Sequence, residues 1–333
     1  MKHEKIINFV ESNLEIIRSN INSREIIFGI LQGPQHKFQR NAAVFLSITH
    51  AYDLCNFLQL SYSVLQNQIN NPVYKQFEIK KKSGGMRSIE EPNDILKGIQ
   101  KRLNYYLQAY YLWIKPAEVH GFIIRPQQYE HRYNIVENAR AHIGKKHVLN
   151  LDIKDFFSSI SVAQIFELFQ SDYFRFNENM CVALTLLVTH QKHLPTGAPT
   201  SPVLSNFICL GLDRDLREFA EANQLTYTRY ADDLTFSSDV HIPEDVVLDV
   251  MNILKKHAFD INPKKIRMSS SFRKQVVTGI TVNDKVNVDR KLLKKVRAML
   301  HDFAENGLKE ATSKHFKISV DEDSIYCRVL SID

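Results

Sequence analysis

The amino-acid sequence predicts an α+β fold in which a helical N-terminal extension precedes an antiparallel sheet. Apolar residues recur near the helical period over residues 1 to about 70. Further along, short runs rich in β-branched and aromatic residues flank tight polar turns, as at residues 225–230 and 234–237. At 333 residues, the chain exceeds one typical domain and suits two or three subdomains around a shared core.

The composition narrows the class of protein. A hydrophobic content of 44% is ample for a globular core, and a net charge of +6 is compatible with a polyanionic partner. No apolar run reaches membrane-spanning length, and the amphipathic N-terminus does not resemble a signal peptide. The histidines show no zinc-site spacing. We therefore expect a cytoplasmic protein without a membrane partner, with reduced thiols at its four cysteines, Cys55, Cys181, Cys209 and Cys327.

The first third of the chain alternates helices with a basic hairpin. Residues 6–17 form one amphipathic segment, and residues 52–69 resemble two short helices, which we interpret as a packing module rather than a DNA reader. Residues 77–80 and 86–89 predict two strands around a basic turn. Residues 94–114 are helical, with aromatic residues concentrated late; these either pack in the core or stack on bases, namely Tyr105, Tyr106, Tyr110, Tyr111 and Trp113.

Two adjacent carboxylates stand at the tip of a predicted hairpin. Asp232 and Asp233 lie between the strand-like runs 225–230 and 234–237, and Asp152 ends another strand-like run at 147–153. Neighbouring side chains on a strand point to opposite faces, so a tight turn is needed to bring both acids to one site. Three convergent aspartates suit a pair of Mg²⁺ ions, the arrangement that clamps the oxygens of a phosphoryl transfer. The alternative is an ordinary polar turn.

Three further segments carry candidate site residues. After Asp152, the following turn can place Phe157 beneath the sugar of a nucleotide, whereas the alternative puts Phe156 and Phe157 both in the core. In residues 194–202, Gly197 and Ala198 allow close backbone approach, and Ser201 is the expected N-cap of one long helix through Phe219. A plain helix-entry loop is the alternative there.

The C-terminal third is basic. Of the paired lysines at 264 and 265, Lys265 is the better candidate for a general acid that assists a departing pyrophosphate; solvated surface lysines are the alternative. Residues 275–282 predict one strand with a glycine kink. Residues 289–307 predict an amphipathic helix that ends at Gly307. Its cations could follow phosphates along a duplex or simply be solvated: Arg290, Lys291, Lys294, Lys295 and Arg297.

The ordered set of segments resembles a reverse transcriptase. Residues 150–157, 194–202, 230–233 and 261–265 match successive blocks of that superfamily in order. Within it, the chain is most similar to bacterial retron reverse transcriptases. Their NAxxH segment matches residues 138–142, their VTG block matches residues 277–279, and their fingers hairpin resembles residues 81–87. The resemblance covers roughly residues 75 to 300.

This resemblance implies a right-hand polymerase architecture. We expect a helical extension at 1–74, fingers at 75–146, a catalytic palm with an antiparallel sheet at 147–285, and a short or truncated basic thumb at 286–333. The implied activity is RNA-directed DNA synthesis that copies part of a cognate noncoding RNA from a 2′-hydroxyl into a branched RNA–DNA product. The implied partners are that structured RNA, its product, dNTPs and an effector protein, in anti-phage defence.

The resemblance also implies roles for individual residues. Asp152, Asp232 and Asp233, with the backbone carbonyl of Ile153, would bind two Mg²⁺ ions, for which Mn²⁺ could substitute; Lys265 completes the catalytic set. Nucleotide contacts are expected from the basic and loop residues around the site, namely Arg87, Phe156, Phe157, Gly197 and Ala198. RNA contacts are expected from Asn138, His142, Val277, Thr278, Gly279, Arg290, Lys291, Lys294 and Lys295.

Some positions depart from the pattern. Thr196 stands where many reverse transcriptases have glutamine, and Ile266 stands where a threonine often follows the lysine pair. The C-terminal stretch, ending at residues 328–333, contains no clear last thumb helix. No ribonuclease H, endonuclease or integrase pattern is present, so removal of RNA would need another protein. The rival functions are another bacterial reverse transcriptase, of the group II intron or abortive-infection type, and a non-catalytic RNA-binding scaffold.

Overall fold

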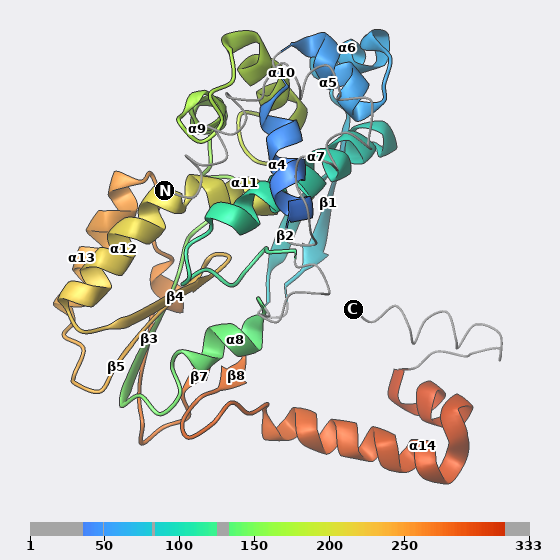
Figure 1. The fold of residues 1–333 in the computed structure, drawn as a ribbon. Helices are drawn as coiled ribbons and strands as arrows, with labels where there is room; N and C mark the ends of the chain where they lie inside the picture. The colour runs from blue at the N-terminus through green and yellow to red at the C-terminus, as the bar shows by residue number, and fades with distance from the viewer. Residues whose placement is uncertain (1–35, 49, 82–83, 125–132, 317–333) are drawn as a thin grey trace.

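A computed structural model describes residues 36–48, 50–81, 84–124 and 133–316 (Figure 1). The predicted amphipathic segment at 6–17 and the C-terminal stretch at 328–333 lie outside these residues. Within them, no helix is both long and apolar enough to cross a membrane. The fold combines helices with antiparallel sheets, as predicted.

The upper part of the molecule includes the long helix α7 (Asp94–Ile114) and the three helices that precede it in the described residues, α4 (His36–Leu46), α5 (Ala51–Leu58) and α6 (Tyr62–Asn70). The two short helices predicted within 52–69 are α5 and α6. Gln59 closes α5 in the left-handed conformation, and the Ser61 side chain accepts a hydrogen bond from the Val64 N–H to begin α6. Both helices contact α10 (Glu178–Val188), which supports the interpretation as a packing module.

The basic hairpin is formed by β1 (Tyr74–Lys80) and β2 (Met86–Pro92), paired antiparallel from Tyr74 opposite Pro92 to Lys80 opposite Met86. Most of its residues are exposed, so the two strands project from the helical part as a ribbon (Figure 1). The C-terminal end of β2 leads directly into α7, where the Asn93 side chain accepts from the Leu96 N–H as the N-cap.

A four-stranded antiparallel sheet forms the centre of the lower part, in the order β4-β5-β3-β6. Its strands are β3 (His147–Asp152), β4 (Thr226–Tyr230), β5 (Asp233–Ser238) and β6 (Arg267–Ser270). The predicted hairpin and the strand that ends at Asp152 are thus neighbours in one sheet. Helices α12 (Leu210–Ala222) and α13 (Asp245–Lys256) contact each other, and α12 contacts β4.

The long helix predicted after residue 201 is two helices. α11 (Ser201–Ile208) and α12 meet at Cys209, which caps both. The prediction of Ser201 as N-cap is wrong. Thr200 is the cap residue, and the Ser201 hydroxyl instead donates to the Pro195 carbonyl at 2.7 Å, which fixes the loop that precedes the helix. Periodicity alone does not reveal a break where the apolar face continues on both sides.

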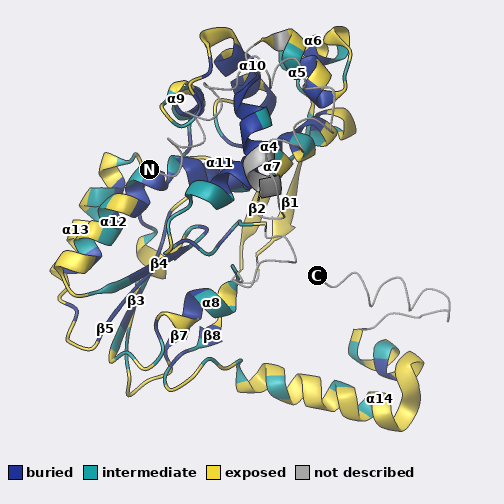
Figure 2. Cartoon of the chain, viewed as in Figure 1, coloured by how far each residue is buried: buried dark blue, intermediate teal, exposed yellow. Residues whose placement is uncertain are grey.

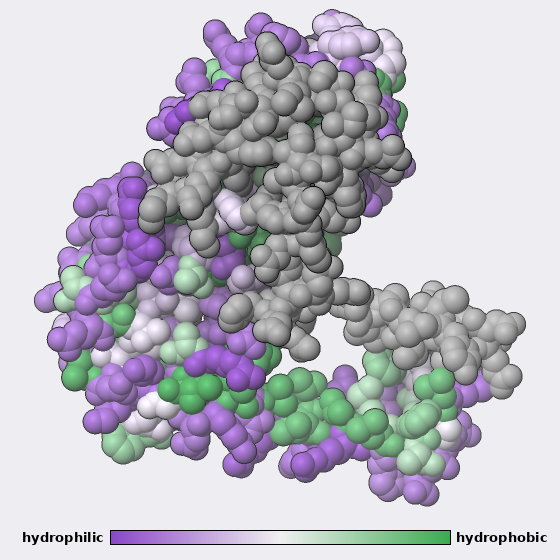
Figure 3. Space-filling model, in the orientation of Figure 1, coloured by the Kyte–Doolittle hydropathy of each residue, from purple (hydrophilic) through white to green (hydrophobic). Residues whose placement is uncertain are grey.

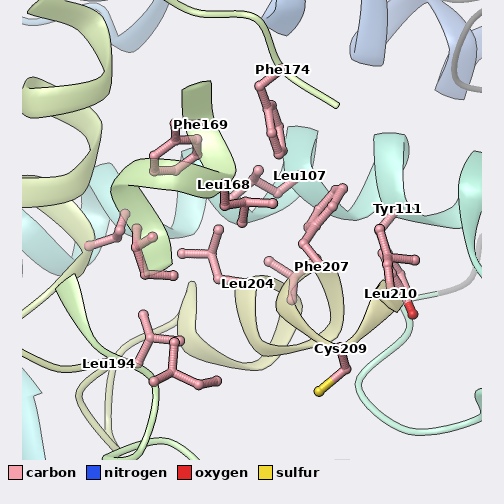
Figure 4. Packing of buried hydrophobic residues seen from close by; sticks show 14 of the residues in the cluster. Leu107, Tyr111, Leu168, Phe169, Phe174, Leu194, Leu204, Phe207, Cys209 and Leu210 are labelled. Carbon is pink, nitrogen blue, oxygen red and sulfur yellow. The ribbon is translucent and has the colours of Figure 1, made fainter. Parts of the chain in front are cut away.

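One continuous core joins the two parts of the molecule. α11 lies at its centre, and its Leu204 and Phe207, with Leu210 at the start of α12, pack among residues of α7, of α9 (Val162–Gln170) and of the loop that follows α9 (Figure 4). The Phe207 ring contacts the Phe174 ring at 5.0 Å between centroids. Figure 2 shows buried residues concentrated in α10, α11 and the sheet. Because the core is shared, the sheet and the helices of the upper part are held by the same packing.

A second, small core lies beside the sheet. It consists of α8 (Ile135–Arg140), β7 (Val276–Val277) and β8 (Ile280–Thr281), which enclose Ala139, Val148, Val277, Ile280 and Val282. The single kinked strand predicted at 275–282 is therefore a hairpin. Its turn residues Thr278 and Gly279 both have positive φ, at 46° and 82°, which is the requirement of a tight hairpin turn.

The last described helix, α14 (Arg290–Phe316), projects away from the sheet (Figure 1). The predicted helix is present and ends where expected, because Gly307 leaves the helical conformation with φ 79° and ψ 172°; a second helical segment follows it within the bounds of α14. Its apolar stripe is exposed along the part before Gly307 (Figures 2 and 3), at Leu292, Val296, Leu300 and Phe303.

Candidate active site

The sheet brings the three predicted aspartates to one edge. Asp152 at the end of β3 is the antiparallel partner of Asp233 at the start of β5. Tyr230 pairs with Asp233 across the hairpin, so the turn consists of Ala231 and Asp232. The Ile153 N–H donates to the Asp232 carbonyl at 2.9 Å, which ties the turn to the strand below it. Asp152, distant in sequence, thus stands beside the adjacent pair Asp232 and Asp233.

The aspartates interact strongly enough to change one another's protonation. Burial, reinforced by the negative charge of Asp152, raises the pKa of Asp232. The pKa of Asp233 rises to about 6, first through desolvation by the surrounding protein and then through repulsion from Asp232 and Asp152. The side chain of Asp233 nevertheless reaches solvent. The site therefore carries an excess of negative charge that a bound cation would relieve.

Lys265 supplies one positive charge to this cluster. Its Nζ lies 2.5 Å from Oδ2 of the buried Asp152 carboxylate. The lysine comes from the short 3₁₀ helix η1 (Pro263–Lys265), which is anchored because the Asn262 N–H donates to the Asp152 carbonyl at 2.8 Å. Arg87, on the exposed face of β2, acts on the same site, since its charge lowers the pKa of Asp232. Lys265 thus contacts one of the aspartates and Arg87 acts electrostatically on another, while the catalytic and nucleotide-binding roles of the two residues stay predictions.

The three carboxylates do not stand ready as a metal cage. In the described part of the chain, no three histidine, cysteine, aspartate or glutamate side chains are grouped so that they could hold a metal ion as they stand. One oxygen of Asp152 is taken by Lys265, and mutual repulsion opposes convergence of the others. The donor set itself consists of carboxylate oxygens, which suit Mg²⁺ or Mn²⁺. Only Oδ2 of Asp152 is bonded to Lys265, so the carboxylate has a second oxygen that could face a metal ion.

The paired phenylalanines occupy different environments. Phe156 is buried in the core, where its ring lies 5.8 Å from that of Phe259, so the predicted nucleotide contact of Phe156 is not supported by its position. Phe157 is half-buried and stacks at 5.7 Å on Phe122. The alternative placed both rings in the core; it holds for Phe156, and Phe157 remains a candidate for sugar contact.

Gly197 and Ala198 pack against the projecting ribbon. A Cβ at Gly197 would lie 2.7 Å from the Glu90 carbonyl oxygen and 2.9 Å from the Ile89 side chain, both on β2. Ala198 is buried. The close approach predicted at Gly197 therefore exists, but its partner is the backbone of β2. Any contact of this loop with a nucleotide is additional to that packing.

Two features of the site escaped prediction. A Cβ at Gly121 would lie 2.3 Å from the Ala231 nitrogen, so only glycine fits beneath the hairpin turn. Arg229, one residue before Tyr230, is fully buried and pairs with Asp213 of α12. A buried ion pair between residues on a strand and a helix leaves no local pattern in the sequence.

Comparison with known proteins decides the family. Residues 79–317 match the family described as reverse transcriptase (RNA-dependent DNA polymerase). The chain is 34% identical over 261 residues to the retron Mx65 reverse transcriptase of Myxococcus xanthus, covering 73% of this chain and 58% of that protein. It is 32% identical over 234 residues to the retron Ec86 reverse transcriptase of Escherichia coli, covering 68% and 69%. This chain belongs to the retron reverse transcriptases.

A third relative, the retron Mx162 reverse transcriptase of Myxococcus xanthus, is 30% identical over 266 residues, covering 69% of this chain and 52% of that protein. The matched stretch thus spans little more than half of the two Myxococcus proteins. The match includes every aspartate of the site described above, since all lie within residues 79–317. The resemblance to retron reverse transcriptases inferred from the sequence blocks is confirmed.

The two signature segments of this retron reverse transcriptase contact each other. Asn138 is buried and its Nδ2 lies 3.4 Å from Oγ1 of Thr278, whose hydroxyl donates to the Ile135 carbonyl. His142 is fully buried and hydrogen-bonds Ser237 at 2.6 Å and Thr228 at 2.8 Å. The expected RNA contacts of Asn138, His142 and Val277 are therefore corrected, because their side chains face the protein interior. Thr278 and Gly279, at the turn, remain accessible.

The basic face of α14 in this retron reverse transcriptase is exposed, as a surface for a polyanion requires. Arg290, Lys291, Lys294 and Lys295 all reach solvent. Asp289 precedes them and accepts from the Lys291 N–H at 2.7 Å, which begins the helix, while its other oxygen binds Lys274. The helix is thus attached to the small core by its N-terminal end.

Proposed function

We propose that this chain synthesises DNA on an RNA template, in the manner of retron enzymes. The observation that carries the proposal is the pairing of Asp152 with Asp233 across β3 and β5, with Asp232 in the adjoining turn, inside a stretch that matches reverse transcriptases. Acids collected at one strand edge, beside Lys265 and Arg87, suit the binding of a metal-chelated triphosphate.

Each residue then has a chemical task. Asp152, Asp232 and Asp233, with the Ile153 carbonyl, hold two divalent ions; when bound, these polarise the phosphate and stabilise charge on the entering and leaving oxygens. Lys265, which can leave Asp152 when cations replace it, donates a proton or a hydrogen bond to the departing pyrophosphate. Arg87 binds triphosphate oxygens from the ribbon, and Phe157 lies under the sugar and disfavours a 2′-hydroxyl.

The domain division follows from the same proposal. Residues 75–146 serve as fingers, with the exposed β1–β2 ribbon, and residues 147–285 serve as the palm. Residues 286–333 serve as a basic thumb, and residues 1–74 as the helical extension. The small core joins α8, at the end of the proposed fingers segment, to β7 and β8 of the proposed palm, and its accessible turn at Thr278 and Gly279 supports a role in seating a structured RNA.

The substrate and product follow from the family. We propose a cognate structured noncoding RNA as template, priming from one of its 2′-hydroxyls, and a branched RNA–DNA product. An effector protein acting in anti-phage defence is the proposed partner. The retron names of the relatives at 30–34% identity support this choice over a group II intron or abortive-infection enzyme.

The test is DNA synthesis by the purified protein bound to its RNA, with dNTPs and Mg²⁺. Asp232→Asn should reduce incorporation about 1000-fold or more, because loss of a metal-binding carboxylate removes several kcal/mol of transition-state stabilisation. Asp239→Asn is the matched control, since Asp239 follows the opposite end of β5 and binds Lys145. Synthesis that persists in Asp232→Asn, or that is lost equally in Asp239→Asn, would contradict the proposal.

A further inference from the structure

A fully buried arginine lies directly behind the hairpin turn that carries two of the acids. The Arg229 Nε and Nη2 atoms donate to the two oxygens of Asp213 at 2.7 and 2.6 Å, and both side chains have no solvent exposure. The pair is thus a bidentate fork with nearly ideal geometry. Asp213 lies on α12, so the pair fixes β4 to the helix behind the sheet.

The third nitrogen of the same guanidinium reaches the turn itself. Nη1 of Arg229 donates to the Ala231 carbonyl at 3.1 Å and to the Asn206 side-chain oxygen at 3.0 Å. The Asn206 amide in turn donates to the Gly121 carbonyl at 3.0 Å. The Arg229 side chain therefore links β4 to α12 and to the Ala231–Asp232 turn and, through Asn206, to the segment at Gly121.

The turn needs this support because its conformation is costly. Ala231 has φ 58°, a left-handed conformation that residues with a Cβ adopt only when surrounding contacts enforce it. The two carboxylates that follow it, Asp232 and Asp233, repel each other when both are ionised. Gly121 also approaches the turn closely, since a Cβ there would meet the Ala231 nitrogen at 2.3 Å. These contacts are therefore the ones that oppose relaxation of the turn.

We infer that Arg229, held by Asp213 and Asn206, is a positioning residue that fixes the Ala231–Asp232 turn and thereby sets the affinity of the three aspartates for divalent cations. This inference deepens the proposed function and rests on it for its catalytic consequence. The charge of Arg229 is neutralised by Asp213, so its effect on the site is geometric. Lysine cannot replace it, because a single ammonium cannot serve Asp213, Asn206 and Ala231 from three fixed directions.

The alternative is that the pair only stabilises the fold. A buried ion pair by itself is weak evidence for stability, because desolvation offsets the attraction between the charges. The two roles differ in what they change. A stabilising role lowers the unfolding temperature and leaves cation affinity unchanged in the folded protein, whereas a positioning role weakens cation affinity at temperatures where the variant is still folded.

The experiment measures Mn²⁺ binding to the full chain without RNA, from the electron paramagnetic resonance signal of the free ion. Binding at the three aspartates is the Mn²⁺ binding that the wild type shows and that the double variant Asp232→Asn, Asp233→Asn lacks. Arg229→Lys and Asn206→Ala are the test variants, measured well below their unfolding temperatures. Tyr110→Phe is the matched control: it removes another buried hydrogen bond of the same core, the 2.6 Å bond to the Tyr173 carbonyl, away from the turn.

Both test variants should weaken Mn²⁺ binding about 10-fold or more, the effect typical of residues that orient metal ligands. Tyr110→Phe should lower the unfolding temperature without changing Mn²⁺ affinity.

An Mn²⁺ affinity within twofold of wild type in a folded test variant would overturn the inference. If Arg229→Lys fails to fold, the result for Asn206→Ala decides. Absence of site-specific Mn²⁺ binding in the wild type would also overturn it. A wild type that binds Mn²⁺ and makes no DNA would contradict only the proposed function.

Discussion

His142 shows how one residue can be recognised correctly and interpreted wrongly. It was expected to contact RNA as part of the NAxxH segment, yet it is buried between Ser237 and Thr228 of the sheet. Burial lowers its pKa from 6.5 to about 3, so the ring is neutral in the folded protein. Its role is to fasten α8 to the sheet, which positions the small core.

This burial makes the fold sensitive to acid. Because the folded-state pKa lies below the unfolded value, the stability contributed by neutral His142 is present above pH 6.5 and is lost as the pH falls toward 3. At about 1.4 kcal/mol per pH unit, the loss between pH 6.5 and 4.5 is about 2–3 kcal/mol. Urea unfolding of His142→Gln should show a correspondingly smaller dependence on pH over this interval. Equal pH dependence in wild type and variant would contradict the assignment.

Asp233 makes stability depend on pH in the opposite direction. Its folded-state pKa of about 6 lies above the ordinary value of 3.8, so ionisation in the folded protein is unfavourable and stability falls as the pH rises from about 4 through 6. Asp233→Asn should therefore raise the unfolding temperature of the metal-free protein at pH 7.5. Mg²⁺ should stabilise the wild type more than the variant.

Asp239 provides the control for this prediction, because its hydrogen bond with Lys145 lowers its pKa. Asp239→Asn should leave the unfolding temperature unchanged or lower it slightly. A rise as large as that of Asp233→Asn would show that removal of any negative charge stabilises this chain.

At the scale of elements, local patterns predicted most helices and strands. The β1–β2 ribbon, α7 and the β4–β5 hairpin follow from periodicity and turn residues, which act over a few positions. The errors occur where distant contacts decide. Cys209 divides one apolar stretch into α11 and α12, and the packing of Val277 and Ile280 into the small core folds the stretch at 275–282 into a hairpin.

Gly307 is the element-scale feature with the clearest consequence. Its φ of 79° and ψ of 172° are essentially restricted to glycine, and they turn the end of α14 back so that Lys314 and His315 bind Asp302. Gly307→Ala should favour one straight helix. Spin labels at positions 297 and 313 should then lie about 24 Å apart along the helix axis, farther than in otherwise unsubstituted protein. Asn306→Ala is the control and should leave the distance unchanged; an unchanged distance in Gly307→Ala would contradict the account.

At the scale of the whole molecule, α14 stands apart as an exposed basic and apolar helix. We propose that its exposed lysines bind the phosphates of an RNA or RNA–DNA duplex. Replacing Lys291, Lys294 and Lys295 by glutamine should weaken RNA binding and reduce the slope of log affinity against log salt by about two. The measurement is a filter-binding titration at several salt concentrations.

The matched control replaces Lys255 and Lys256, exposed at the end of α13, by glutamine. This variant should leave both affinity and slope near those of the wild type. Equal effects of the two sets would indicate that RNA binding depends on overall charge rather than on α14.

The sequence predicts those residues of the candidate site that stand in a recognisable local pattern, such as a strand end or a turn. Asp152 ends an apolar strand, and Asp232 and Asp233 stand in a turn between two strands, so the sequence alone indicated their convergence. The support beneath them was not predictable, because Asp213 and Arg229 lie on different elements and Gly121 belongs to a loop that only the fold brings to the turn. The contact between Lys265 and Asp152 likewise joins residues that are distant in sequence, so only the fold reveals it.

The central claim is that Asp152, Asp232 and Asp233 jointly hold the divalent ions on which DNA synthesis depends. Its most direct test is a crystal of the protein with RNA, a dNTP analogue that does not react, and Mn²⁺, measured at a wavelength where manganese scatters anomalously. The account predicts anomalous peaks bounded by these three carboxylates, with Lys265 released from Asp152. Peaks located elsewhere, with the Lys265–Asp152 pair intact beside a bound nucleotide, would contradict it.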